Sequence, residues 1–212
     1  FKAGEDILYI AFSSKMSGTF NQMDKAVKAL SEKYPTARFT KFDTLSICMG
    51  AGLIVYLGAK FFKANGGDVD KTVEYLNSIV NRCCVRFAVE DLKYLARGGR
   101  LSAGKAAIGN LLNLKPILGV GESGEIDVLC KQNGTKKALS YMAAQVAEKY
   151  SPYDDAPIVI VDADAKNLAD ELEAKVVEKF PDAKIWRQPI GPVIGAHCGP
   201  GSVGVIFPST GR

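Results

Sequence analysis

The sequence predicts an α/β protein with two lobes, an N-terminal lobe over residues 1–82 and a C-terminal lobe over residues 83–212. Up to residue 82 the expected elements follow the order strand, helix, strand, helix, helix, which is typical of a parallel sheet. Beyond that point, two apolar-rich strands flank the turn Gly121-Glu122-Ser123-Gly124 and predict an antiparallel hairpin. We therefore expect a parallel α/β sheet in the first lobe and a mixed sheet in the second.

The first lobe begins with an apolar run that predicts a buried parallel strand over Asp6–Phe12. The chain opens at Phe1 without a methionine and soon enters this strand, so we expect the first sheet to be incomplete at its start. Apolar residues at helix or strand spacing predict the remaining elements: a helix over Gly18–Tyr34, a strand over Ala37–Asp43, and helices over Ile47–Ala64 and Asp68–Arg82.

The second lobe is predicted from the same kinds of spacing. Its elements, in chain order, are a strand over Val85–Val89, a turn at Leu92–Leu95, a helix from Ala103 to Leu112 capped by Ser102, strands over Leu114–Val120 and Glu125–Lys131, a helix over Thr135–Tyr150, a strand over Pro157–Asp162, a helix over Asn167–Phe180, and strands over Ala183–Arg187 and Ser202–Phe207. The segment GPVIGAHCGPG, residues 191–201, is expected to be a loop because it contains four glycines and two prolines.

Composition places the chain among ordinary globular proteins. Of its 212 residues, 47% are hydrophobic and 24% are charged, and the net charge is +4. The basic residues are spread along the chain, which argues against nucleic-acid binding. The apolar run Ile47–Phe62 is interrupted by glycines and Lys60, so we interpret it as a buried helix and expect no membrane span.

The five cysteines and the single histidine indicate neither a disulfide framework nor a zinc site. The cysteines show no CxxC spacing and their number is odd. Reduced thiols and a cytoplasmic location are therefore expected, and no signal peptide is recognised at the N-terminus. We expect no metal and no cofactor.

A glycine motif over Gly119–Gly124 matches the GxGxxG pattern of dinucleotide-binding proteins letter for letter. That fingerprint requires a helix after the glycines, because the pyrophosphate binds at the helix N-terminus. The following residues, Glu125–Leu129, alternate as in a strand. We interpret the motif as a hairpin turn.

Serines gather in the loop after the first strand, Ser13-Ser14-Lys15-Met16-Ser17-Gly18-Thr19. Ligands of open parallel sheets bind beyond the carboxyl ends of the strands, where this loop is expected to lie. Hydroxyls and the free N–H groups of a helix N-terminus suit a carboxylate or a phosphate. The alternative is that Ser17 simply caps the following helix.

His197, the single histidine, falls in the glycine-rich segment, where backbone can approach a ligand closely. A loop histidine is also often structural. A catalytic dyad of His197 with its neighbour Cys198 is disfavoured, because adjacent residues of an extended chain point in opposite directions.

Two arginines flank a glycine pair in the corner Arg97-Gly98-Gly99-Arg100. Such a corner suits an anion or a partner protein. A solvated turn, with the arginine side chains lying over apolar surface, explains the same residues.

Four separated blocks resemble the DegV family of bacterial fatty-acid-binding proteins, in the same order and over essentially the whole chain: AFSSKMSGTFNQ, FDTLSICMGAGLIV, FAVEDLKYLARGGRLS with LLNLKPIL, and IGPVIGAHCGPGSVGVIF. The resemblance implies two α/β lobes around a buried acyl chain. It also implies that Ser13, Ser14 and His197 hold the fatty-acid carboxylate, together with a threonine from a segment upstream of this chain. Cys198 departs from the family pattern, which usually has threonine there.

The resemblance further implies a non-catalytic carrier, since some relatives serve as the lipid-carrying subunit of a fatty acid kinase. We expect the chain to bind a long-chain fatty acid in a buried apolar tunnel and to present its carboxylate to the catalytic subunit of such a kinase, with transient membrane contact left open. Arg97 and Arg100 are candidates for docking the kinase or steadying the acyl phosphate. The tunnel wall is expected to include Met49, Leu53, Ile54, Leu57, Phe61, Ile108, Leu111 and Leu112.

Two other functions are kept as alternatives. The first is a serine-dependent hydrolase or phosphotransferase with Ser14 as nucleophile and His197 as base. The second is a regulatory module that binds a different carboxylate ligand. The apolar content of the chain argues mildly against that second alternative.

Overall fold

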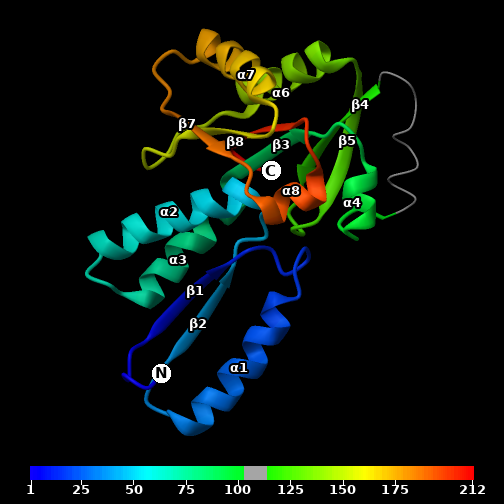
Figure 1. Cartoon of the computed structure of the whole chain (residues 1–212). Coiled ribbons are helices and arrows are strands. Elements are labelled where there is room, and N and C mark those ends of the chain that lie inside the picture. Colours follow the sequence, from blue (N-terminus) through cyan, green and yellow to red (C-terminus); the bar gives the residue numbers. More distant parts are fainter. Residues whose placement is uncertain (103–113) are drawn as a thin grey trace.

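A computed structural model describes residues 1–102 and 114–212 and contains two β-sheets (Figure 1). The small sheet pairs β1 (Ile7–Ala11) with β2 (Phe39–Asp43) in parallel. The large sheet has the strand order β5-β4-β3-β8-β6-β7. Its strands are β3 (Cys83–Ala88), β4 (Leu114–Val120), β5 (Ile126–Asn133), β6 (Ile158–Ala163), β7 (Ile185–Pro189) and β8 (Ser202–Pro208). The predicted mixed α/β class is confirmed.

The large sheet is mixed, because only β6 and β7 pair in parallel while the other neighbours are antiparallel. The GxGxxG segment forms the turn between the antiparallel strands β4 and β5, as predicted. Along β6 the side chains alternate between two apolar clusters: Ile158 and Ile160 belong to one, Val159 and Val161 to the other. This period of two shows that both faces of the sheet are covered.

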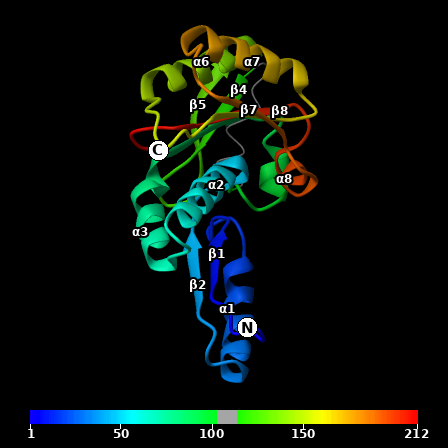
Figure 2. The same cartoon turned by 90° about the vertical axis from the view of Figure 1, so that its left-hand side faces the viewer.

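Helices cover the two faces of the large sheet. The helices are α1 (Thr19–Lys33), α2 (Cys48–Ala64), α3 (Val69–Ile79) with a short 3-10 turn (Val80–Arg82), α4 (Lys93–Arg97), α6 (Thr135–Lys149), α7 (Lys166–Lys179) and α8 (Pro192–Cys198). Figures 1 and 2 show α6 and α7 side by side over one face, with α2 and α8 on the other. No helix within the described ranges is long and apolar enough to cross a membrane.

The first apolar cluster joins the two sheets. It contains Phe42 of β2, Leu53 and Leu57 of α2, Leu76 of α3 and Ile206 of β8. Helix α2 is therefore the shared wall between the small and the large sheet, which agrees with its nearly all-round apolar sequence. The second cluster lies between the large sheet and the helices α6 and α7.

Two local predictions were wrong, and the alternative that Ser17 caps the following helix is not supported. The segment expected to be a loop contains helix α8, because Pro192 stands in its first turn, where a fixed φ and a missing N–H are tolerated. The expected turn at Leu92–Leu95 continues into helix α4. Helix α1 is capped by Gly18 rather than Ser17, and Gly18 offers no side-chain hydrogen bond. The predicted helix from Ala103 to Leu112, with Ile108, Leu111 and Leu112, lies outside the described residues.

Candidate functional site

A cavity of about 300 Å³, called the central cavity below, opens between the small and the large sheet. Most of the side chains that line it are apolar: Phe12, Met16, Ile47, Phe87, Leu95, Ile126, Val193 and Ile194. The other lining residues are Ser17, Thr19, Arg100, His197 and Cys198. A mainly apolar hollow with a few converging polar groups is the usual form of a small-molecule site.

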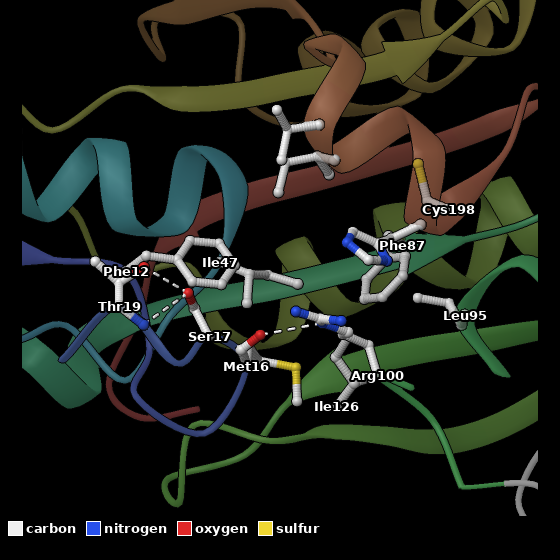
Figure 3. Close-up of a pocket in the computed structure, with 13 residues that line it drawn as sticks. Phe12, Met16, Ser17, Thr19, Ile47, Phe87, Leu95, Arg100, Ile126 and Cys198 are labelled. Atoms are coloured by element: carbon white, nitrogen blue, oxygen red, sulfur yellow. Dashed lines mark hydrogen bonds between the residues drawn. The ribbon is translucent and has the colours of Figure 1, made fainter. Parts of the chain in front are cut away.

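One side of the central cavity is built from segments that follow the parallel strands of the small sheet. The loop after β1 contributes Phe12, Met16 and Ser17, and the segment after β2 contributes Ile47. Since both strands point the same way, their carboxyl ends meet at one edge, where ligands of such sheets bind. The other side comes from the second half of the chain, with Phe87, Leu95 and Cys198 facing it (Figure 3).

Ser17, Thr19 and Arg100 form a polar group at the wall of the cavity (Figure 3). The hydroxyls of Ser17 and Thr19 are 2.7 Å apart, and the Thr19 N–H donates to Ser17 Oγ at 3.3 Å. Arg100 Nε donates to the Met16 carbonyl at 3.1 Å and its Nη1 donates to the Gly98 carbonyl. The arginine corner is thereby joined to the loop after β1, although 84 residues separate them in the sequence.

His197 lies in the last turn of α8 and lines the central cavity. Its imidazole fits against α4 because Gly98 has no side chain: a Cβ at Gly98 would lie 2.1 Å from His197 Nδ1. Nδ1 is buried and has no hydrogen-bond partner among the described residues. Buried polar atoms are normally paired, so the unpaired nitrogen is unusual and draws attention to the His197 ring beside the cavity.

Ser13 is fully buried and does not line the central cavity. Its hydroxyl donates to the Gly124 carbonyl at 2.8 Å and accepts from the Lys15 N–H at 3.3 Å. The bond to Gly124 joins the loop after β1 to the β4–β5 turn. In this structure Ser13 therefore connects the two halves of the chain.

Ser14 is exposed, and its N–H lies 3.3 Å from both carboxylate oxygens of Asp43. It lines a surface depression of about 440 Å³ beside the central cavity, not the cavity itself. The depression is lined by Ser14, Lys15, Met16, Ser17, Gly18, Phe20, Asn21, Gly99 and Arg100. Met16, Ser17 and Arg100 line both hollows, so the two adjoin.

The two arginines of the corner differ in their surroundings. Arg97 is exposed, with its guanidinium 5.3 Å from the centre of the Tyr94 ring, and it lines neither hollow. Arg100 is half-buried between the central cavity and the depression. Of the predicted site residues, the structure brings together Arg100 and His197 at the cavity and leaves Ser13, Ser14 and Arg97 outside it.

Nucleophilic chemistry finds little support in this geometry. Ser14 and His197 line different hollows, whereas the hydrolase alternative requires the two side chains to lie within hydrogen-bonding reach of each other. Burial raises the pKa of the Cys198 thiol, which keeps it protonated and weakly nucleophilic. The reason given above against a His197–Cys198 dyad was wrong, because both residues are helical, yet the buried thiol leads to the same conclusion. No cluster of three metal-binding side chains occurs within residues 1–102 and 114–212.

The sequence did not identify several lining residues. Ser17 and Thr19 belong to the serine-rich loop whose hydroxyls were expected to suit a carboxylate, but only Ser13 and Ser14 of that loop were named as ligands. Phe87 and Ile126 come from strands that meet the cavity only through the tertiary fold. The wall residues expected in α2 do not line the cavity, and Leu53, Ile54 and Leu57 are buried in the core instead.

Comparison with protein families matches residues 1–210 to the family described as "Uncharacterised protein, DegV family". A DegV domain-containing protein of Clostridium perfringens is 38% identical over 206 residues, which make up 97% of this chain and 70% of that protein.

Solved structures with the same fold include proteins described by their lipid ligands. The fatty acid binding DegV family protein of Streptococcus agalactiae is 29% identical, with a TM-score of 0.82 over 97% of this chain and 71% of that one. The Fatty Acid Kinase (Fak) B3 protein of Streptococcus pneumoniae, loaded with linoleic acid, is 20% identical, with a TM-score of 0.83 over 96% of this chain and 71% of that one. At 20% identity the likeness shows the shared fold alone.

Proposed function

The chain belongs to the DegV family, and on this premise we propose that it binds a long-chain fatty acid in the central cavity and presents the carboxylate to a partner kinase for phosphorylation. The observation that carries the proposal is the composition of the cavity wall. Its apolar side chains come from both sheets, and Ser17, Thr19, Arg100 and His197 are the polar groups among them.

The apolar wall supplies the driving force for binding. Each buried methylene contributes ~0.8 kcal/mol, so burying all of about fifteen methylenes would give roughly 12 kcal/mol to set against an association cost of ~4–15 kcal/mol. The cavity volume of about 300 Å³ is at the lower end of the range of ligand pockets. A cavity of this volume suits the head of the ligand and the first part of its chain.

The carboxylate needs hydrogen-bond donors, because a buried and unpaired charge is costly. We propose that the His197 imidazole and the Ser17 and Thr19 hydroxyls supply them, with Arg100 contributing positive charge. Ser13 and Ser14 remain predicted carboxylate ligands. In the described geometry Ser13 would act by ordering the loop after β1, and Ser14 would reach the head group from the surface depression.

The surface depression gives the kinase a route to the carboxylate. It is open to solvent and shares Met16, Ser17 and Arg100 with the central cavity. We propose that the γ-phosphate of the kinase's ATP meets the carboxylate there, and that Arg100 neutralises negative charge during the transfer. Arg97, which is exposed on the same corner, is proposed to contact the kinase.

The binding proposal is tested by organic extraction of the purified protein followed by mass spectrometry. We expect a long-chain fatty acid at about one molecule per chain, unmodified and non-covalently bound. Protein that yields no acyl lipid, and that also fails to bind added palmitate or the fluorescent 18-carbon cis-parinaric acid, would rule it out.

The two arginines make separable predictions for the kinase step. Arg97→Glu is expected to retain bound fatty acid, because Arg97 does not line the cavity, and to lower acyl-phosphate formation by the kinase and ATP. Arg100→Glu is expected to lower acyl-phosphate formation more strongly. Trapping the acyl phosphate with hydroxylamine measures both. If either variant supports full turnover, that arginine has no role in the transfer.

A further inference from the structure

Arg212 extends its guanidinium into the junction between the two halves of the chain. Nη2 donates to the carbonyls of Thr44 at 2.8 Å and Val80 at 2.7 Å. Nη1 donates to the Gly121 carbonyl at 3.0 Å and to the Leu45 carbonyl. We call the guanidinium and these four carbonyls the Arg212 clasp. The carbonyls come from three segments: the loop after β2, the 3-10 turn after α3, and the β4–β5 turn.

Hydrogen bonds anchor the backbone just before Arg212. Ser209 N–H donates to the Arg82 carbonyl at 2.8 Å, and Arg82 Nε donates to the Ser209 carbonyl at 3.3 Å. Ser209 Oγ also donates to the Gly211 carbonyl at 2.7 Å. A planar guanidinium with donors in a fixed fork can hold several carbonyls at set spacings when its own backbone does not move.

Two of the clasped segments lead directly into the central cavity. Leu45 precedes Ile47, which lines the cavity from the small-sheet side. The β4–β5 turn that contains Gly121 precedes Ile126, which lines it from the large-sheet side. Leu45 has a φ of +46°, a conformation that costs free energy for a branched side chain and requires support from its surroundings. Arg212 gives that support at the Leu45 carbonyl.

We propose that Arg212 is a positioning residue for the ligand site: by holding the loop after β2 to the β4–β5 turn, it sets the separation of Ile47 and Ile126 and so the width of the central cavity. Arg212 does not line the cavity, so it would act on a ligand only through the segments that it holds. The inference rests on the proposed function, because its consequence is measured as fatty-acid affinity.

The test uses cis-parinaric acid as the probe and compares Arg212→Met, Arg212→Lys and Arg212→Ala with the unaltered protein. We expect each variant to bind about tenfold more weakly, the equivalent of one lost hydrogen bond to a charged group. Arg212→Lys is included because it keeps the charge but cannot reach four carbonyls. Arg38→Met is the matched control, since Arg38 is an exposed arginine that pairs with Asp70 away from the cavity.

Chemical rescue separates positioning from general stabilisation. Methylguanidinium is expected to restore affinity in Arg212→Ala, and methylammonium at the same concentration is not. Leu172→Ala, which destabilises the buried core beneath α7, serves as a variant of reduced stability and should keep its affinity while it remains folded. Arg212 variants that bind as tightly as the unaltered protein would overturn the inference alone. An unaltered protein that does not bind the probe would overturn the proposed function, and the inference with it.

Discussion

At the scale of single residues, the site depends on contacts that place a few polar groups against an apolar wall. His197 is the clearest case, because its position requires the absence of a side chain at Gly98. The imidazole is then held between α4 and α8, beside the cavity, with Nδ1 buried. The pair Gly98 and His197 therefore acts as one unit, although 99 positions separate the two residues in the printed sequence.

Gly98→Ala is expected to displace the imidazole and to weaken the binding of cis-parinaric acid by about tenfold, the typical cost of one charge-assisted hydrogen bond. The new Cβ would lie 2.1 Å from Nδ1 and 3.2 Å from the Tyr94 carbonyl oxygen. Gly195→Ala is the control, since a Cβ there meets nothing within 4 Å. Fluorescence titration of both variants decides the matter: equal affinities would show that the position of His197 is unimportant.

At the scale of elements, the β4–β5 turn contacts the loops that follow both strands of the small sheet. Gly124 has a φ of +84° and lies against Leu45, and its carbonyl accepts a hydrogen bond from the Ser13 hydroxyl. The same turn also supplies the Gly121 carbonyl to Arg212. The hairpin turn is thus one of the contacts between the two halves of the chain, beside the Arg100–Met16 bond and the apolar cluster around α2.

Two glycines with the same φ allow this contact to be measured. A Cβ at Gly124 would lie 2.6 Å from Ser13 Oγ and 3.1 Å from Leu45 Cα, whereas a Cβ at Gly134 meets nothing within 4 Å, and both residues have a φ of +84°. Gly134→Ala is expected to lower the free energy of unfolding by ~1–3 kcal/mol from backbone strain, because its φ of +84° with a ψ of +162° is a conformation that residues other than glycine rarely adopt. Gly124→Ala is expected to lower it by a further ~1–3 kcal/mol. Urea denaturation gives both values, and equal losses would contradict the close contact.

At the scale of the whole molecule, the buried thiols and phenols are expected to make the folded state less stable as the pH rises into the alkaline range. Burial raises the pKa of the Cys83 thiol to about 12 and also raises the pKa values of Cys84 and Cys198. Burial likewise raises the pKa of the Tyr153 phenol. Cys83 and Tyr153 pack in the cluster that joins the two sheets, Cys84 packs in the cluster beneath α6 and α7, and Cys198 lines the central cavity, so ionising these groups would disrupt the packing on both faces of the large sheet.

The sign of the pH effect follows from proton linkage. The unfolded chain releases its thiol protons near pH ~8.5, whereas the folded chain keeps them, so the folded state binds more protons above that pH. The thermal midpoint is therefore expected to stay level up to about pH 8.5 and to fall as the pH rises toward ~12. Cys83→Ala should make this fall shallower. A midpoint that is unchanged up to pH ~11 would contradict the assignment.

The amino-acid sequence by itself determined most of the secondary structure, the mixed α/β class and the family. Apolar spacing is local, so Ile158–Ala163 and Thr135–Lys149 could be identified from their own letters. Local sequence also gave a wrong prediction at α8: its glycines and prolines indicated a loop, but the segment forms a short helix that begins at Pro192. His197 and Arg100 could be chosen as candidate site residues from the sequence, because His197 is the single histidine and lies in a glycine-rich segment, and Arg100 directly follows a pair of glycines.

Only the tertiary structure decided which side chains share a cavity. Ser13 and Ser14 are adjacent in the chain, yet one is buried against Gly124 and the other is exposed in the surface depression. Phe87, Ile126 and Arg212 reach the site region from strands and segments far apart in the sequence. The physical reason is that contacts between segments distant in the sequence set these positions, and each contact depends on the shapes of both segments. Strands and helices, in contrast, follow from residues a few places apart in the chain.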